Sequence, residues 1–172
     1  MHINVEFKAR CSEPEGIRKI LQSKGADYKG RDHQIDVYFN VSNGRLKLRK
    51  GNIENSLIGY EREDYAGAKQ SNVHLVRVEP GSNLEQALTT TLGVKVVVDK
   101  ERDIYFIGNV KFHLDEVKGL GSFMEVEAID SEGTIGREKL QEQCNYYRSL
   151  FGIRDEDMIS QSYSDLLLKK IS

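Results

Sequence analysis

Charged residues at every second position mark several short segments of this chain, and this spacing constrains its fold more than any other feature. Residues 3–10 alternate between apolar and polar side chains, so Glu6 and Lys8 fall on one face of an extended strand. The same spacing groups three further sets of charges on common strand faces: Arg45, Lys47 and Arg49; Lys100 and Arg102; Glu125 and Glu127. A period of two is typical of β-strands. We therefore predict a protein built mainly on strands.

Eight strands and four helices are predicted along the chain. The strands lie at residues 3–10, 34–40, 45–49, 56–63, 72–78, 95–107, 110–117 and 122–129. Apolar residues at helical spacing predict one helix that ends before Gly25, a second that ends before Gly93, and two more at residues 137–151 and 162–169. Runs of strands interrupted by a few helices favour the α+β class. We expect one domain over residues 1–172, with a closed eight-stranded antiparallel β-barrel and covering helices.

The signs of these charges are sorted between strands rather than mixed. Cations gather around residues 47 and 101, whereas carboxylates gather around residue 126. A single alternating strand is typical of a sheet with one solvated face, but solvated faces usually mix both signs. Because the predicted helices need an apolar surface to cover, we expect the charged faces to point into the barrel. A charged interior is tolerable only when it holds water or a charged ligand.

Composition limits the classes of protein to which the chain can belong. Hydrophobic residues make up 38% and charged residues 30% of the 172 residues, which fits a charge-rich globular protein. The net charge of -2 lacks the basic excess usual in nucleic-acid binders. Cys11 and Cys144 are the only cysteines, so we expect no disulfide framework or zinc site and a reducing, cytoplasmic setting. We expect no signal peptide and no membrane span.

Acidic and basic groups that face one interior suit a metal-bound polyphosphate. Carboxylates on neighbouring strands offer the hard oxygen ligands that Mg²⁺ and Mn²⁺ take. Arginine binds phosphate oxygens as a planar fork and lysine binds them as a point charge. The sequence has no Walker-type glycine loop or dinucleotide fingerprint that would offer another phosphate site. His2, His33, His74 and His113 lack the paired spacing of metal ligands, and we interpret each as structural or exposed.

Motifs along nearly the whole chain resemble the CYTH superfamily of triphosphate tunnel enzymes, which includes class IV adenylate cyclases and thiamine triphosphatases. The similar segments are Asn4-Val5-Glu6-Phe7-Lys8, Leu46-Lys47-Leu48-Arg49, Tyr60-Glu61-Arg62, Lys100-Glu101-Arg102, His113-Leu114-Asp115-Glu116-Val117, and residues 119–127 and 162–167. Residues 119–127 are the most specific match, and the whole resembles the bacterial cyclase-like branch. The resemblance implies an antiparallel eight-stranded tunnel that binds a triphosphate.

The resemblance also implies roles for individual residues. The implied ligands of Mg²⁺ or Mn²⁺ are Glu6, Glu125 and Glu127, with Asp115 as a helper. The implied triphosphate-binding residues are Lys8, Lys47, Arg49, Arg62, Lys100 and Arg102, to which alternation or rough position adds Arg45 and Arg77. Lys8 is the implied catalytic residue, because the motif lysine contacts phosphate or positions the attacking group. The family opens with Glu-x-Glu-x-Lys, whereas Asn4 stands here at the first glutamate, which leaves one-metal and two-metal sites both open.

Three functions fit these features. The first, which we predict, is metal-dependent hydrolysis of inorganic triphosphate, a nucleoside triphosphate or thiamine triphosphate, because hydrolysis demands less substrate positioning than cyclisation. The second is an adenylate cyclase that converts ATP to cyclic AMP and pyrophosphate. The third is a non-catalytic binder of polyphosphate or a nucleotide. The same inward charges serve all three, since a fold does not fix the chemistry. The expected partner is a small-molecule triphosphate, without nucleic acid or membrane, and homodimerisation is left open.

Overall fold

The computed structural model of the chain describes residues 2–62 and 67–171, and the side chain of Arg62 lies outside this description. The strands are β1 (His2–Arg10), β2 (Asp27–Phe39), β3 (Arg45–Lys50), β4 (Asn55–Arg62), β5 (Lys69–Arg77), β6 (Val94–Ile107), β7 (Val110–Val117), β8 (Gly121–Asp130) and β9 (Met158–Ile159). The helices are α1 (Pro14–Ser23), α2 (Leu84–Leu92), α3 (Arg137–Phe151) and α4 (Tyr163–Ile171), with a short 3-10 helix at Asp155–Asp157. None of the helices described is long and apolar enough to cross a membrane.

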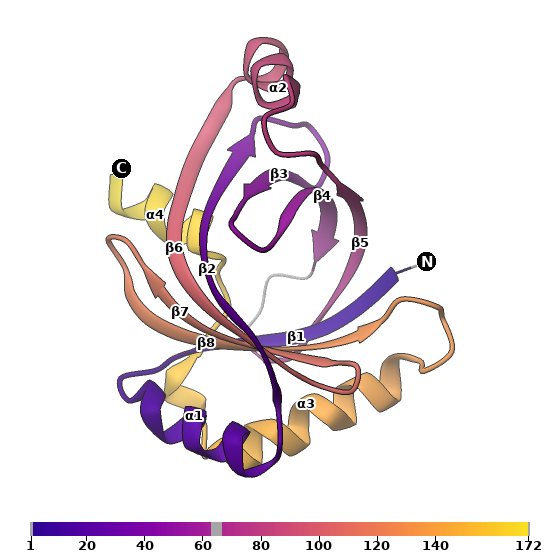
Figure 1. Ribbon diagram of the computed structural model, residues 1–172, viewed down its shortest axis with the longest axis vertical. Helices are drawn as coiled ribbons and strands as arrows, with labels where there is room; N and C mark the ends of the chain where they lie inside the picture. Colours follow the sequence, from indigo (N-terminus) through magenta and orange to yellow (C-terminus); the bar gives the residue numbers. More distant parts are fainter. Residues whose placement is uncertain (1, 63–66, 172) are drawn as a thin grey trace.

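Strands β1 to β8 close into one antiparallel barrel (Figure 1). Neighbouring strands pair in the order β5-β4-β3-β2-β6-β7-β8-β1, and β5 pairs in turn with β1. The short β9 adds to β1 beside the closure, where Met158 lies opposite Ala9. The predicted α+β class and the closed eight-stranded antiparallel barrel are therefore confirmed.

The second strand is longer than its sequence pattern predicts. β2 begins at Asp27 rather than at residue 34, and it pairs with β6 along its length, with an irregularity next to Gly30. The buried side chains in its early part include Asp32 and Gln34, both of which are polar. A strand with polar residues on its inner face carries no apolar period of two, so this segment gives no clear strand signal.

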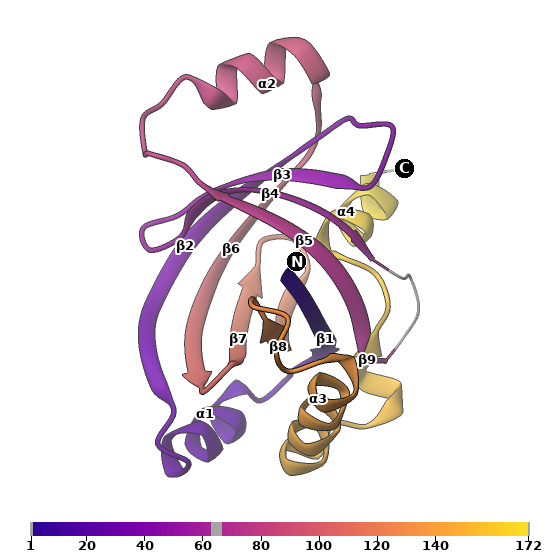
Figure 2. The ribbon, with the colours of Figure 1, turned by 90° about the vertical axis from the view of Figure 1, so that its right-hand side faces the viewer.

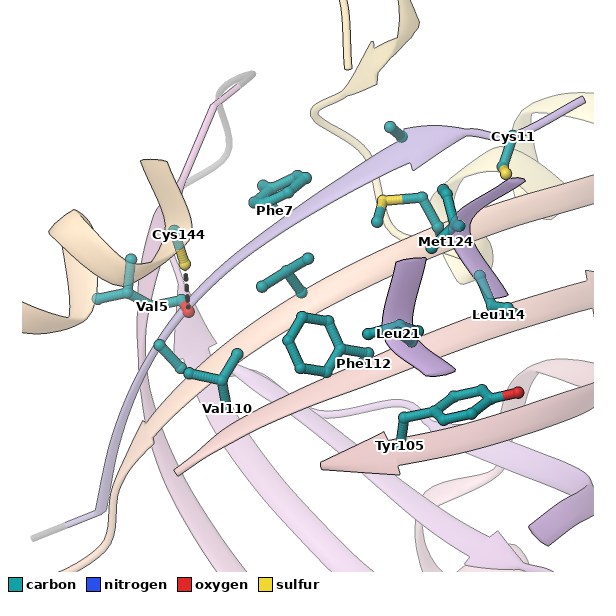
Figure 3. Packing of buried hydrophobic residues seen from close by; sticks show 14 of the residues in the cluster. Val5, Phe7, Cys11, Leu21, Tyr105, Val110, Phe112, Leu114, Met124 and Cys144 are labelled. Carbon is teal, nitrogen blue, oxygen red and sulfur yellow. Dashed lines mark hydrogen bonds between the residues drawn. The ribbon is translucent and has the colours of Figure 1, made fainter. Parts of the chain in front are cut away.

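Helices α1 and α3 cover the outer face of β1, β7 and β8 (Figures 1 and 2). Figure 3 shows Phe7 of β1 and Phe112 of β7 in one apolar cluster with Leu21 of α1 and Cys144 of α3. The Cys144 thiol is buried in this cluster and donates to the backbone oxygen of Val5 at 3.2 Å. Burial of each large apolar side chain contributes about 1.5–3 kcal/mol to folding. Because the apolar residues of these strands face outward, the alternate residues must face the interior.

The remaining helices cover two other parts of the barrel. Leu84, Leu88 and Leu92 of α2 pack on the outer side of β2 and β3, against Phe39 and Leu48. Figure 2 shows α2 lying across the β3 and β4 end of the molecule, far from α1 and α3.

Helix α4 packs against the interior face of the barrel rather than the exterior. Its first residue, Tyr163, lies in one apolar cluster with Val98 of β6 and Phe123 of β8. By strand alternation, Val98 shares a face with Lys100, and Phe123 shares a face with Glu125. Residues 160–171, which we call the C-terminal segment, therefore cover the charged interior at one end of the barrel.

Candidate active site

The barrel encloses a cavity of about 510 Å³ to which all eight of its strands contribute side chains. Nine of the predicted site residues line it: Glu6, Lys8, Lys47, Arg49, Arg77, Lys100, Arg102, Glu125 and Glu127. They converge because α1, α2 and α3 occupy the apolar outer face, which turns the charged positions of each strand inward. Their location agrees with the sequence analysis, and their individual roles stay predictions.

Carboxylates gather on the wall formed by β1 and β8. Glu6 lies directly opposite Glu127 in the strand register, and Lys8 lies opposite Glu125. Asn4 donates from Nδ2 to Oε1 of Glu127 over 2.7 Å. Burial raises the pKa of Glu127 to about 7, and the neighbouring carboxylate of Glu6 adds to the shift. A cation between these carboxylates would relieve their repulsion.

The donor atoms on this wall fit a magnesium or manganese ion. Asn4 Oδ1 is buried, and among the residues that the structure describes it has no hydrogen-bond partner. This amide oxygen lies on the same wall as Glu6 and Glu127, which supply further hard oxygen donors. A divalent cation would use the orphaned oxygen and neutralise the like charges that raise the pKa of Glu127. The predicted Mg²⁺ or Mn²⁺ therefore suits the residues present.

Cations gather on the facing wall, around the buried carboxylate of Asp36. Arg49 donates to both oxygens of Asp36, at 2.9 and 2.8 Å, while Lys100 lies at 2.8 Å and Lys47 at 3.4 Å. Burial alone would raise the pKa of Asp36, but these three cations hold it well below its ordinary value. Burial lowers the pKa of Lys100 to about 7, against the opposing effect of Asp36. Three cations around one carboxylate leave positive charge for an anionic ligand.

Arg102 connects the cationic wall to the acidic wall. Its guanidinium binds Asp115 through Nε at 2.7 Å and Nη2 at 2.8 Å, and Nη2 also lies 3.1 Å from Oε1 of Glu125. The hydroxyl of Tyr163 donates to the same Asp115 over 2.7 Å. Arg102 and Asp115 are both almost fully buried. This bidentate pair fixes the orientation of the guanidinium before any ligand arrives.

Lys8, the predicted catalytic residue, lies between the acidic wall and the C-terminal segment. Its Nζ donates to the backbone oxygen of Gln161 over 3.2 Å and sits 4.2 Å from the centre of the Tyr163 ring. The side chain is buried and lines the cavity. The segment before α4 therefore helps to position this ammonium group.

Two predicted residues have other surroundings, and a third has a side chain that the structure does not describe. Arg45 donates to Oγ of Ser162 at 2.7 Å and pairs with Asp165 at 3.0 Å, so it holds the C-terminal segment and does not line the cavity. Asp115 lies behind Arg102 and is absent from the cavity lining, which favours a role in orienting Arg102 over a role as a metal ligand. The prediction for Arg62 falls on a side chain outside the described residues.

Several cavity residues have no place in the sequence analysis as site residues. Asp36, Glu54, Lys111 and Tyr163 all line the cavity, and so does His113, which we interpreted as structural or exposed. Alternation of Lys111, His113 and Asp115 on one strand was a usable signal for the first two. Asp32, Gln34 and Asp36 also occupy every second position of β2, so alternation could have identified Asp36 as well. Glu54 lies in the turn between β3 and β4, where strand alternation makes no prediction.

His113 is a neutral and unpaired imidazole in this interior. Burial, and after it the charge of Arg102, lower its pKa to about 4. Neither ring nitrogen has a hydrogen-bond partner within the described part of the chain, and Nδ1 lies 3.8 Å from Oε2 of Glu125. Ligand atoms of His113, Asp115 and Glu125 fall within 4.8 Å of one another. The imidazole is therefore available to a ligand of the tunnel.

Apolar side chains line another part of the cavity. They come from the turn after β3, from β5, and from the segment that follows β5: Ile53, Val73, Leu75, Val78 and Pro80. Leu75 and Ile53 are 47% and 45% exposed, so this part meets solvent. The exposed Arg77 lies beside them. The interior thus joins a charged region to an apolar region at the surface.

A sequence profile of the CYTH domain matches residues 2–163, which include all eight strands of the barrel and the whole charged cavity. The chain belongs to the CYTH domain family. Its motifs at Glu6, Lys100 and Glu125, on which the resemblance rested, thus lie within one CYTH tunnel.

One curated protein and two solved structures illustrate what this CYTH chain is similar to. MJ0240 of Methanocaldococcus jannaschii, named as a candidate adenylate cyclase, is 25% identical over 174 residues, 95% of this chain and 98% of that protein. The PH1012 structure from Pyrococcus horikoshii OT3 is 27% identical with a TM-score of 0.73, covering 95% of this chain and 98% of that one. HpAC1 of Hippeastrum, described as a candidate adenylyl cyclase with a dominant triphosphatase activity, is 14% identical with a TM-score of 0.59, over 99% and 96% of the chains. This last likeness concerns the fold alone.

The first motif position of the CYTH tunnel is where this chain departs from the family pattern. Asn4 occupies it, on the acidic wall beside Glu6 and Glu127. Its amide donates a hydrogen bond to Glu127, which a glutamate could not do in its ionised form. Asn4 thus brings no carboxylate charge to this wall, and it donates a hydrogen bond that orients Glu127, a candidate metal ligand.

Proposed function

We propose that this CYTH protein hydrolyses a triphosphate compound with the help of Mg²⁺ or Mn²⁺. One observation carries the proposal: carboxylates on β1 and β8 face cations on β3 and β6 across a single buried cavity. The carboxylates suit the metal ion of a metal-bound polyphosphate, and the cations suit its phosphate oxygens. HpAC1, which shares the fold, has a dominant triphosphatase activity of its own.

The side chains divide the work of hydrolysis as follows. Lys47, Arg49 and Lys100 bind phosphate oxygens and stabilise the charge that develops as the terminal phosphoryl group is transferred. Arg102, already oriented by Asp115, contributes a further fork of donors. Glu6, Glu125 and Glu127 would hold the metal, which would supply Lewis acidity toward the phosphate oxygens. Lys8 orients the terminal phosphate or the attacking water. Water bonds to the terminal phosphorus and the bridging P–O bond breaks, so the bridging oxygen leaves with the rest of the substrate, as ADP from ATP or as pyrophosphate from triphosphate. The attacked phosphorus becomes orthophosphate, and the proton that water loses passes to a phosphate oxygen or to solvent.

Cyclisation of ATP is a second candidate that one observation favours. The apolar side chains at the cavity opening, among them Val73 and Leu75, offer a surface for a nucleobase. MJ0240 is also named as a candidate cyclase. In that reaction the ribose 3′-hydroxyl attacks the α-phosphorus and pyrophosphate leaves. Binding without catalysis is the third candidate, because Asn4 removes one carboxylate from the motif.

Product analysis separates the three candidates. The protein is incubated with ATP or inorganic triphosphate and with Mg²⁺ or Mn²⁺, and the products are resolved by chromatography. We expect orthophosphate, together with ADP from ATP or pyrophosphate from triphosphate. Cyclic AMP with pyrophosphate would establish the cyclase instead. Measurable binding without either product would leave a binder.

The protonation of Lys100 predicts a pH dependence of ATP binding. Its pKa of about 7 means that it loses its charge as the pH rises, while bound phosphate favours the charged form. Above pH 7 the phosphates of ATP gain little further charge, since a phosphate monoester has its second pKa near about 6. Metal-free ATP affinity should therefore fall by up to about tenfold per pH unit between about pH 7 and 9, with proton uptake. Titration calorimetry in two buffers of different ionisation heat measures both quantities.

The matched variant for this pH dependence is Lys100→Arg. Arginine stays protonated at all these pH values, so the affinity of the variant should fall less steeply from pH 7 to 9, with the remaining slope due to the deprotonation of Glu127. A profile as steep as that of the native protein would show that another group causes the loss.

Replacement of Asn4 by glutamate tests the departure from the family motif. Asn4→Glu adds a carboxylate beside Glu127, so we expect half-maximal activity at a lower Mg²⁺ or Mn²⁺ concentration. Without metal, the same variant should melt at a lower temperature, because it loses a hydrogen bond and gains a like charge. Metal titrations of activity and of melting temperature test both halves. An unchanged or higher metal requirement would show that position 4 is not a ligand position.

A further inference from the structure

The Asp32 side chain on β2 binds the backbone of the turn between β3 and β4, at residues 51–54. This fully buried carboxylate accepts hydrogen bonds from the backbone amides of Asn52, Ile53 and Glu54, at 2.6, 2.9 and 3.0 Å. A Cβ atom on Gly51 would lie 2.7 Å from Asp32 Oδ2 and 2.7 Å from the backbone oxygen of Glu54, so no side chain fits there. The position of the turn is thus set by backbone contacts, independently of the Glu54 side chain.

The turn directs Glu54 into the tunnel, where its carboxylate meets two cations. One oxygen, Oε2, pairs with Nζ of Lys111. The other, Oε1, lies 3.3 Å from Nη1 of Arg49 and accepts a hydrogen bond from Nε2 of Gln34 at 2.8 Å. Burial alone would raise the pKa of Glu54, but Lys111 and Arg49 hold it well below its ordinary value. Glu54 is therefore an anion throughout the neutral range.

Glu54 bridges the two walls of the tunnel. Lys111 lies opposite Glu127 in the register of β7 and β8, next to the acidic wall. Arg49 belongs to the cationic wall, where it binds Asp36. An anion that contacts both cations thus occupies the position that a phosphate group between the walls would take. The Glu54 side chain is 25% exposed, and it can rotate away while its backbone stays fixed.

We propose that Glu54 is an internal competitor that fills a phosphate subsite, formed by Arg49 and Lys111, until a ligand displaces it. The inference rests on the proposed triphosphate ligand. In the empty tunnel the carboxylate compensates two cations that would otherwise repel each other. In the occupied tunnel the fixed turn keeps the carboxylate nearby, so it competes with the ligand and speeds its release. Glu54 therefore determines how tightly and for how long a phosphate is held.

The test is the binding of inorganic triphosphate without metal, measured by calorimetry and stopped flow. Glu54→Gln should bind it on the order of tenfold more tightly than the native protein, the scale of one charge-assisted hydrogen bond. The gain should lie mainly in a slower dissociation rate. The control is Glu116→Gln, which makes the same charge change at a 65% exposed position on the outside of β7. Its affinity should match that of the native protein.

A double-mutant cycle links the gain to the subsite. In a Lys111→Gln background, Glu54→Gln should give a smaller gain, because one of the two contested cations is gone. If Glu54→Gln does not fold, Glu54→Asp serves instead: it keeps the charge, is one methylene shorter, and should give a smaller gain of the same sign.

The outcomes distinguish this inference from the proposed function. Unchanged or weaker triphosphate binding in Glu54→Gln, with normal binding by the native protein, would overturn the competitor role alone. Failure of the native protein to bind triphosphate both without metal and with Mg²⁺ or Mn²⁺ would overturn both. A gain of the same size in Glu116→Gln would also overturn the inference, because it would show that net charge rather than the subsite is responsible.

Discussion

The double substitution of Glu125 and Glu127 by glutamine should lower metal-dependent turnover by more than about 100-fold, since loss of even outer-shell partners of a metal costs about 10–100-fold. Both carboxylates lie on β8 and line the cavity opposite Lys8 and Glu6. Glutamine keeps the volume and one acceptor oxygen but brings no charge to a divalent cation. Activity assays across a range of Mg²⁺ and Mn²⁺ concentrations measure the loss.

The barrel should survive this double substitution. Burial and Glu6 already raise the pKa of Glu127, so a neutral side chain at that position costs little. Loss of the Glu125 charge removes one partner of Arg102, which keeps its bidentate bond to Asp115. Circular dichroism should be unchanged. Glu116→Gln on the outside of the barrel is the matched control and should keep full activity. Full metal-dependent turnover in the double variant would rule out the metal assignment.

Removal of the Arg102 side chain should destabilise the protein more than removal of any exposed arginine. Arg102→Ala leaves Asp115 buried with the Tyr163 hydroxyl as its remaining described donor, and it takes a partner from Glu125. Breaking a buried ion pair from one side costs about 3–5 kcal/mol. For a chain of this length that corresponds to a fall in melting temperature of roughly 6–20 °C. Thermal unfolding followed by circular dichroism measures it.

Two further variants show whether the unpaired charge causes this loss. Asp115→Asn in the Arg102→Ala background removes that charge, so part of the lost stability should return. Arg154→Ala removes an arginine that is 69% exposed and paired only with acidic neighbours of its own loop in the described structure, and it should change stability by less than about 0.5 kcal/mol. A loss in Arg102→Ala no larger than in Arg154→Ala would contradict the buried-pair account.

The inward orientation of the site could be predicted because it depends only on a local rule. Side chains alternate across a strand, so one apolar face fixes where the other face points. For β8 this rule places Glu125 and Glu127 together, and for β6 it places Lys100 and Arg102 together. The order of strands and helices along the chain then selects the barrel, since the helices need the apolar outer face.

The same rule fails where contacts depend on distant elements. Alternation groups Arg45 with Lys47 and Arg49, yet Arg45 holds Asp165, which is 120 positions away in the chain. Asp115 resembles a metal ligand by motif, but the docking of α4 brings Tyr163 to it and the register of β6 brings Arg102. No local pattern encodes either contact.

The sequence by itself determined which strand faces are apolar and which are charged, the order of the elements, and membership of the CYTH family. Only the tertiary structure decided which anion neutralises which cation: Asp36 for Arg49 and Lys100, and Glu54 for Lys111. The physical reason is that strand faces depend on local sequence, whereas ion pairs join residues that are far apart in the chain. Strand alternation is set by the backbone one residue at a time, whereas the energy of an ion pair depends on a separation of a few ångström and on burial. The separation and the burial of an ion pair are determined only once the strand register, the 51–54 turn and the C-terminal segment are all in position.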